Sequence, residues 1–123
     1  MPSEHQGALG ISTDQKIESE RLVLLLIIGI ATALQEKLIS IDEAERYLFS
    51  PFTMHQLEQS GINREIVDII HLGTELENVQ SLLPDNMVDS IDRILTLALA
   101  ALKELPKSNH PIRIWMDKQG TTV

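Results

Sequence analysis

The stretch Leu22–Ala33 reads LVLLLIIGIATA and contains neither a charged residue nor a proline. It is the most apolar stretch of the chain, and the polar run Gln35-Glu36-Lys37 follows it. A helix with these residues is apolar on every face, so we expect protein to surround it on most sides. Gly29 lies inside this helix, where glycine costs about 1 kcal/mol relative to alanine. We therefore predict a buried N-terminal helix that another helix approaches closely at Gly29.

Capping residues divide the rest of the chain into further helices. Ser40 and Ser50 each precede a helical segment whose first turn can donate a backbone hydrogen bond to the serine oxygen, and Asn63 opens a further helix. Gly73 is suited to end a helix, and Thr74-Glu75-Leu76-Glu77 fits a capping box. The last helix has an apolar stripe that includes Met87, Val88 and Ile91. The predicted helices are 14–38, 41–49, 51–59, 63–72, a segment that begins near 74, and 84–105.

These elements predict an all-α fold, a compact single-domain bundle of about five to six helices around the buried N-terminal helix. Residues 1–13 show no sustained periodicity and are expected to form a flexible arm, so the helical domain covers 14–105. In the tail, 106–123, apolar residues alternate with other residues, which predicts a short C-terminal strand or hairpin. A frayed tail is the alternative.

Length and composition exclude several classes of protein. A chain of 123 residues is long enough for one domain with its own core. Cysteine is absent, which excludes disulfides, thiolate metal sites and cysteine nucleophiles and fits a reducing compartment. The apolar run 22–34 is shorter than the roughly 20 residues that a membrane span needs. We therefore expect a cytoplasmic protein that does not enter the membrane.

The net charge of −8 is concentrated in the middle of the chain. From Asp42 to Glu77 there are eight acidic residues and two arginines, with no lysine. Such a surface repels nucleic acid and favours a basic protein partner, whose encounter rate and specificity it raises. The alternative is that the charge serves only to keep the protein soluble.

No motif for catalysis or cofactor binding can be assembled from the sequence. There is no serine in a nucleophile elbow and no glycine-rich phosphate loop. Asp68, His71 and Glu75 have a spacing that places them on one helix face, where they could hold a divalent metal, but this spacing matches no specific metalloprotease signature. We predict a protein that is not an enzyme and has neither a metal nor a cofactor.

Three of the four aromatic residues lie within Tyr47–Phe52. We expect Phe49 and Phe52 to be part of the core. Tyrosine beside acidic residues is typical of interface centres, so Tyr47 is a candidate contact residue, with a place in the core as the alternative.

Four blocks of sequence together resemble a family of small bacterial proteins of unknown function. They are LLLIIGI at 24–30, ISIDEAE at 39–45, LFSP at 48–51 and IIHLGTELE at 69–77, and the resemblance covers about 17–105. It implies a bacterial origin and supplies no catalytic or binding residue. By analogy, small acidic proteins without cysteine are also similar in character to the immunity proteins that shield a bacterium from its own toxin.

The sequence thus leads to one main hypothesis and one alternative. The main hypothesis is an immunity-type inhibitor whose acidic surface covers a basic domain of a cognate toxin. The alternative is a homo-oligomeric structural or regulatory protein, for example a homodimer formed through apolar surfaces and the tail. The predicted partner-binding residues are Asp42, Glu43, Glu45, Tyr47, Asp68, Glu75 and Glu77.

Overall fold

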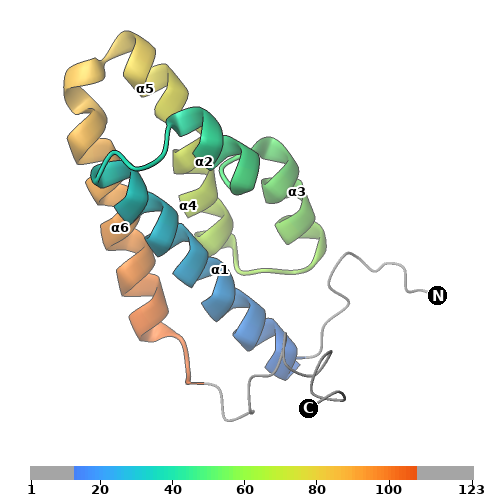
Figure 1. Ribbon diagram of the computed structural model, residues 1–123. Coiled ribbons are helices and arrows are strands. Elements are labelled where there is room, and N and C mark those ends of the chain that lie inside the picture. The colour runs from blue at the N-terminus through green and yellow to red at the C-terminus, as the bar shows by residue number, and fades with distance from the viewer. Residues whose placement is uncertain (1–12, 108–123) are drawn as a thin grey trace, which may run out of the picture.

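The computed structural model of the chain describes residues 13–107, all of whose regular elements are helices (Figure 1). In chain order these are α1 (Thr13–Gln35), α2 (Ile41–Tyr47), α3 (Pro51–Gln59), α4 (Arg64–Thr74), α5 (Leu76–Leu82), the short 3-10 helix η1 (Pro84–Asn86) and α6 (Met87–Glu104). The predicted all-α fold is therefore confirmed. Five to six helices were predicted, but within the described range only four helices have nine residues or more. Helices α2 and α5 have seven residues each. The predicted arm, 1–13, and the predicted tail or hairpin, 106–123, lie outside the described residues, except for residues 13, 106 and 107.

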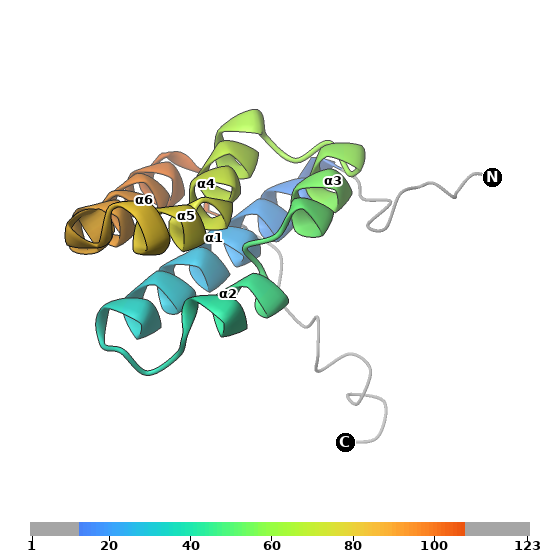
Figure 2. The same cartoon turned by 90° about the horizontal axis from the view of Figure 1, so that it is seen from above.

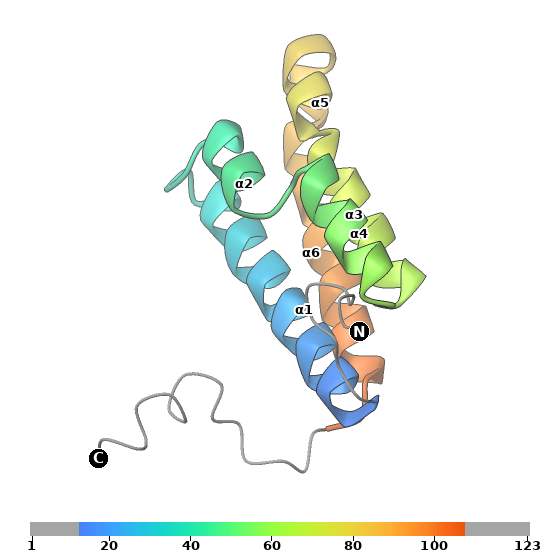
Figure 3. The ribbon, with the colours of Figure 1, turned by 90° about the vertical axis from the view of Figure 1, so that its right-hand side faces the viewer.

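The helices pack around the pair formed by α1 and α6. These two helices lie side by side and run in opposite directions (Figures 1 and 3). Helix α4 packs against both, and α3 packs against α4. Seen from above, α1 lies between α2 and the layer that contains α4, α5 and α6 (Figure 2). None of the helices in the described range is both long and apolar enough to cross a membrane.

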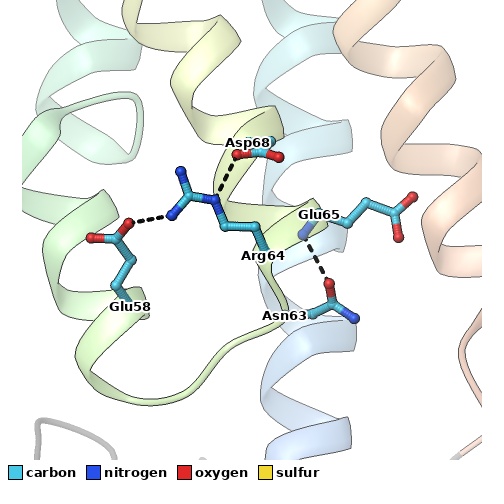
Figure 4. Close-up of polar contacts among 5 residues, drawn as sticks. All are labelled: Glu58, Asn63, Arg64, Glu65 and Asp68. Atoms are coloured by element: carbon cyan, nitrogen blue, oxygen red, sulfur yellow. Dashed lines mark hydrogen bonds and ion pairs between the residues drawn. The ribbon is translucent and has the colours of Figure 1, made fainter.

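Local sequence signals fix where three helices begin. The Ser40 Oγ accepts a hydrogen bond from the Glu43 N–H at 3.0 Å, and the Ser50 Oγ accepts one from the Thr53 N–H at 3.2 Å. Asn63 caps α4 in the same way (Figure 4). The N-caps predicted at Ser40 and Ser50 are confirmed, and the helix predicted to open at Asn63 begins one residue later. The capping box predicted at Thr74 is wrong, because the Thr74 hydroxyl donates to the His71 carbonyl and α5 begins without a side-chain cap.

Helix α1 ends at Gln35, three residues earlier than predicted. Lys37 takes a left-handed conformation with φ at 60°, the Lys37 N–H donates to the Leu34 carbonyl, and the Leu38 N–H donates to the Ala33 carbonyl. This pair of hydrogen bonds defines a Schellman motif, in which glycine usually occupies the position of Lys37. The turn reverses the chain and leads it into α2.

One face of α1 is open to solvent, which corrects the prediction of a helix covered on most sides. Leu24 and Ile27 are completely buried, but Leu25 is 51% exposed and Leu26 is 48% exposed. A Cβ atom added to Gly29 would have no neighbour within 4 Å, so no helix approaches there. The reason is topological. Helices α4 and α6 cover one side of α1, α2 contacts α1 only slightly, and no described helix covers the opposite side.

Gly73 has a packing role instead of the predicted role as a helix end. Helix α4 continues through it to Thr74, and Gly73 is buried against the ring of Phe49, which is itself 1% exposed. A Cβ atom at Gly73 would lie 2.6 Å from both Cδ atoms of that ring. The core position predicted for Phe49 is confirmed, and only glycine leaves room for it.

Replacing the two helical glycines should therefore have opposite effects on stability. Gly73→Ala should lower the free energy of unfolding by about 1–3 kcal/mol, because the core must shift to admit the methyl group. Gly29→Ala, the matched control, should raise it by up to about 1 kcal/mol through helix propensity. Denaturant unfolding of dilute protein measures both changes. Equal effects of the two substitutions would contradict this packing.

Glu20 is a buried acid that the sequence did not reveal as structural. Its side chain is 4% exposed, and its Oε2 accepts a hydrogen bond from the Asn63 N–H at 2.7 Å. This bond joins α1 to the connection between α3 and α4. It therefore fixes the start of α4 beside the first helix.

Loss of the Glu20 carboxylate should loosen that connection. Glu20→Ala should lower the free energy of unfolding by about 1–3 kcal/mol, the usual cost of removing a hydrogen bond to a charged group. Asp92→Ala on the exposed side of α6 should change it by about 0.5 kcal/mol or less. Denaturant titrations of the two variants beside the wild type give the comparison. A Glu20 variant as stable as the Asp92 variant would show that the bond contributes nothing.

Candidate functional site

A groove with a volume of about 1070 Å³ lies where the connection between α1 and α2 passes the start of α6. In Figure 1 this connection lies beside the N-terminal turns of α6. Most of the lining comes from residues 34–43, with one residue of α5, one of η1 and three of α6. The lining residues are Leu34, Gln35, Glu36, Lys37, Leu38, Ile39, Ser40, Ile41, Asp42, Glu43, Gln80, Pro84, Met87, Val88 and Ile91.

Two large aliphatic side chains of this groove face water. Leu38 and Val88 are each 75% exposed. Leu38 follows the left-handed Lys37, and Val88 lies in the first turn of α6. The sequence placed Val88 in the buried stripe of the last helix, and that prediction is wrong because Val88 lines the open groove and not the core. Neighbouring exposed apolar residues of this kind mark surfaces that bind other molecules.

Acidic side chains of α2 form one rim of the groove. Asp42 and Glu43 both line it. Asp42 forms an ion pair with Arg46 at 3.4 Å, and the Glu43 carboxylate accepts a hydrogen bond from the Tyr47 hydroxyl at 2.9 Å. That hydrogen bond, together with the negative charge of Glu43, raises the pKa of Tyr47 above its ordinary value. Tyr47 is exposed, so it is available for contact as the sequence indicated.

Glu45 and Glu77 bring two negative charges together from different helices. Helices α2 and α5 are in contact, and the two carboxyl groups lie close enough to share a hydrogen bond. Partial burial, followed by the charge and hydrogen bond of Glu77 and the charge of Asp42, raises the pKa of Glu45. Among the described residues neither Glu45 nor Glu77 forms an ion pair with a basic side chain. The repulsion between them is therefore not relieved within this part of the molecule.

The predicted contact residues Asp68 and Glu75 lie beside an arginine and a histidine, respectively. Asp68 accepts from Arg64 at 3.1 Å, and the same guanidinium reaches Glu58 at 2.8 Å (Figure 4). Glu75 lies 3.7 Å from the His71 imidazole. The acidic set predicted from the sequence thus divides in two. Asp42, Glu43, Glu45 and Glu77 lie on α2 and α5, whereas Asp68 lies on α4 beside Arg64 and Glu75 follows the end of α4 beside His71.

The metal-ligand spacing considered at Asp68, His71 and Glu75 does not produce a cluster. Asp68 turns toward Arg64, and only His71 and Glu75 contact each other. Within residues 13–107 no group of three or more histidine, aspartate or glutamate side chains is arranged to hold a metal ion.

Sequence reasoning missed the apolar part of this site and misassigned one aromatic residue. Phe52, expected in the core, is exposed in the first turn of α3. Leu38 belonged to a predicted helix that in fact ends three residues before it. The polar run Gln35-Glu36-Lys37 could have indicated this part of the groove, because such a run predicts the end of the helix. Leu38 then lies outside the helix and is exposed.

The burial of Glu45 and its repulsion by Glu77 predict a pH-dependent gain in stability from Glu45→Gln. Because the folded-state pKa lies above 4.5, the folded protein binds this proton more tightly than the unfolded chain. Folding therefore loses stability from this group as the pH rises through the raised pKa. The variant should have a higher Tm than the wild type at about pH 7, and the difference should shrink toward about pH 4.

Thermal unfolding at the two pH values measures this effect. Asp92→Asn removes one charge far from the pair and serves as the control. A Glu45→Gln variant whose Tm difference is the same at both pH values would mean that neither burial nor Glu77 raises the pKa of Glu45.

One family model matches the chain, and its description is "Protein of unknown function (DUF3969)". The match covers residues 14–117, so it includes the described helices except the first residue of α1, Thr13, and continues past α6. It confirms the resemblance to a family of unknown function and extends it beyond 17–105. No curated protein and no solved structure matches the chain.

Proposed function

The chain belongs to the DUF3969 family of proteins of unknown function, and we propose that it is a non-enzymatic binding protein. Its partner is a protein that presents a basic segment with an apolar face. In the most specific form of the proposal, the chain is an immunity-type inhibitor that neutralises a cognate toxin domain in the cytoplasm. The supporting observation is the groove beside α2, where exposed Leu38 and Val88 adjoin acidic Asp42 and Glu43.

The apolar part of the groove would stabilise a complex with the partner through burial of apolar surface. Burial of exposed aliphatic surface is worth roughly 25 cal/mol per Å², and Leu38 and Val88 are both mostly exposed. A helix that inserts apolar side chains into a groove of this kind is a common mode of recognition. The groove is open along one side of the molecule, so a partner segment can enter without unfolding the bundle.

The acidic part of the site determines which partner fits. A lysine or arginine beside the inserted apolar residues would meet Asp42 and Glu43 at the rim, which raises both the encounter rate and the specificity. A cation between Glu45 and Glu77 would also relieve their repulsion and lower the raised pKa of Glu45. Binding should then release a proton and weaken as the pH falls. The exposed Tyr47, held by Glu43, completes the contact surface.

Capture from cells of the source organism tests this proposal with matched charge variants. One variant carries Asp42→Asn, Glu45→Gln and Glu77→Gln, and the control carries Asp89→Asn, Asp92→Asn and Glu104→Gln on the exposed side of α6. The wild type and the control should capture the same basic protein, and the first variant should capture at least about tenfold less, since close charge pairs are lost. Circular dichroism establishes that all three chains are folded.

The captured protein is then expressed alone and together with the chain. Growth arrest when it is expressed alone, relieved by the wild type but not by the site variant, supports the immunity-type role. A harmless partner would remove the toxin from the proposal and leave only binding. Equal capture by the wild type and the site variant would contradict the proposed site.

A function of a different class, that of a homo-oligomeric structural or regulatory protein, is favoured by a separate observation. The exposed apolar face of α1 lies outside the groove residues and their acidic rim.

A further inference from the structure

One positive charge lies on the groove beside α2. Among the described residues that line the groove, Lys37 is the only basic one, whereas Glu36, Asp42 and Glu43 are acidic. The Lys37 side chain is exposed, and within residues 13–107 it forms no ion pair with an acidic side chain. Its ammonium group is therefore available to a charge that this part of the subunit does not supply.

The backbone at Lys37 is unfavourable for a residue with a side chain. Its φ of 60° lies in the left-handed region, where glycine usually ends a helix and other residues are uncommon. The turn itself is made by backbone groups, since the Lys37 N–H donates to the Leu34 carbonyl. The turn therefore does not require a lysine side chain at this position.

Interaction with the helix dipole does not explain this position either. A positive charge near the end of a helix is favourable, yet the last turn of α1 has no basic residue. The exposed Thr32 lies in that turn, where a lysine would interact with the dipole without a left-handed backbone. It lies outside the groove, whereas Lys37 lines the groove. The place of the amine on the groove is thus the feature that distinguishes position 37.

We infer, on the basis of the function proposed above, that Lys37 binds a carboxylate of the partner. The partner segment then has an acidic group on the α1 side of the groove and a basic group on the α2 side, beside Asp42 and Glu43. Five residues of chain separate Lys37 from Asp42, so the two lie at most about 18 Å apart. A helix covers that distance in about 12 residues. One short partner segment therefore reaches both charges.

The two opposite charges determine the direction in which the segment binds. Burial of apolar surface is non-directional, so Leu38 and Val88 alone do not distinguish the two directions. In the reverse direction the basic group of the segment would lie beside Lys37 and its acidic group beside Asp42. Both contacts would be repulsive, and repulsion of this kind excludes wrong partners. A uniformly basic segment is disfavoured for the same reason.

Charge reversal at Lys37 tests for the carboxylate. The probe is the basic protein that the wild-type chain captures, titrated with purified full-length variants. Lys37→Glu should raise the dissociation constant about tenfold or more, because close charge pairs at interfaces are strongly coupled. A partner without the carboxylate gives the opposite result, because Lys37→Glu makes the acidic surface more acidic and attracts a uniformly basic segment more strongly. Unchanged or tighter binding overturns the inference.

Two further substitutions separate the charge of Lys37 from its effect on the fold. Lys37→Arg keeps the positive charge and should keep most of the affinity. Lys37→Gly suits the left-handed backbone, so it should not lower the Tm, yet loss of the amine should raise the dissociation constant about threefold or more. A folded Lys37→Gly variant that binds as tightly as the wild type overturns the inference.

Lys103→Glu is the matched charge reversal at the exposed end of α6. At physiological salt it should change the dissociation constant by less than about twofold, because charges beyond a Debye length are screened. A loss of affinity equal to that of Lys37→Glu would mean that net charge alone sets the binding, which also overturns the inference.

Reciprocal reversal locates the carboxylate on the partner. Each aspartate and glutamate of the bound segment is replaced by lysine in turn, and a chain extension displaces a terminal carboxylate if the segment has one. One of these changes should weaken binding to the wild type and restore binding to Lys37→Glu, as expected for two groups in contact. If none restores it, Lys37 has no carboxylate partner.

The variant with Asp42→Asn, Glu45→Gln and Glu77→Gln separates an error at Lys37 from an error in the site. Loss of binding in that variant, with full binding by Lys37→Glu, means that the groove binds the partner and only the role of Lys37 is wrong. Equal capture by that variant and the wild type contradicts the site itself, and the role of Lys37 with it.

Discussion

The packing of α1 along α6 is the contact on which the other elements depend. Leu24, Ile27 and Ala31 of α1 are fully buried in the core, as are Ile94 and Ala98 of α6. Helix α4 joins this pair, and Glu20 ties the start of α4 to α1 through the Asn63 backbone. A helix that packs on the core along one side leaves its opposite side uncovered. The contact between α1 and α6 that forms the core therefore leaves Leu25 and Leu26 exposed.

The groove also follows from the way in which α1 ends. The left-handed conformation of Lys37 closes the helix with a Schellman motif and sends Leu38 away from the core. Ser40 then starts α2 at once, so the acidic first turn of α2 lies beside the start of α6. One tight turn thus brings apolar and acidic side chains to the same edge of the molecule. The combination of apolar and acidic side chains at this edge therefore comes from the chain reversal and not from any single residue.

Features set by a few adjacent residues could be predicted from the sequence, and features set by distant neighbours could not. The N-caps at Ser40 and Ser50 depend on hydrogen bonds within three residues, and both were predicted correctly. Gly73 was misread because its role depends on a phenylalanine 24 positions earlier. At the site, the acidic character of α2 was evident in the sequence. The meeting of Glu45 with Glu77 depends on how α5 returns to α2, and no local pattern records that.

Helix α1 has one buried and one open apolar face, and paramagnetic relaxation of its methyl groups by a soluble probe distinguishes the two faces. A soluble paramagnetic probe broadens the NMR signals of methyl groups that it can approach. In dilute, methyl-labelled protein, the account predicts strong broadening for Leu25 and Leu26 and little for Leu24 and Ile27, which are fully buried. Equal protection of all four residues, or equal broadening of all four, would contradict the account.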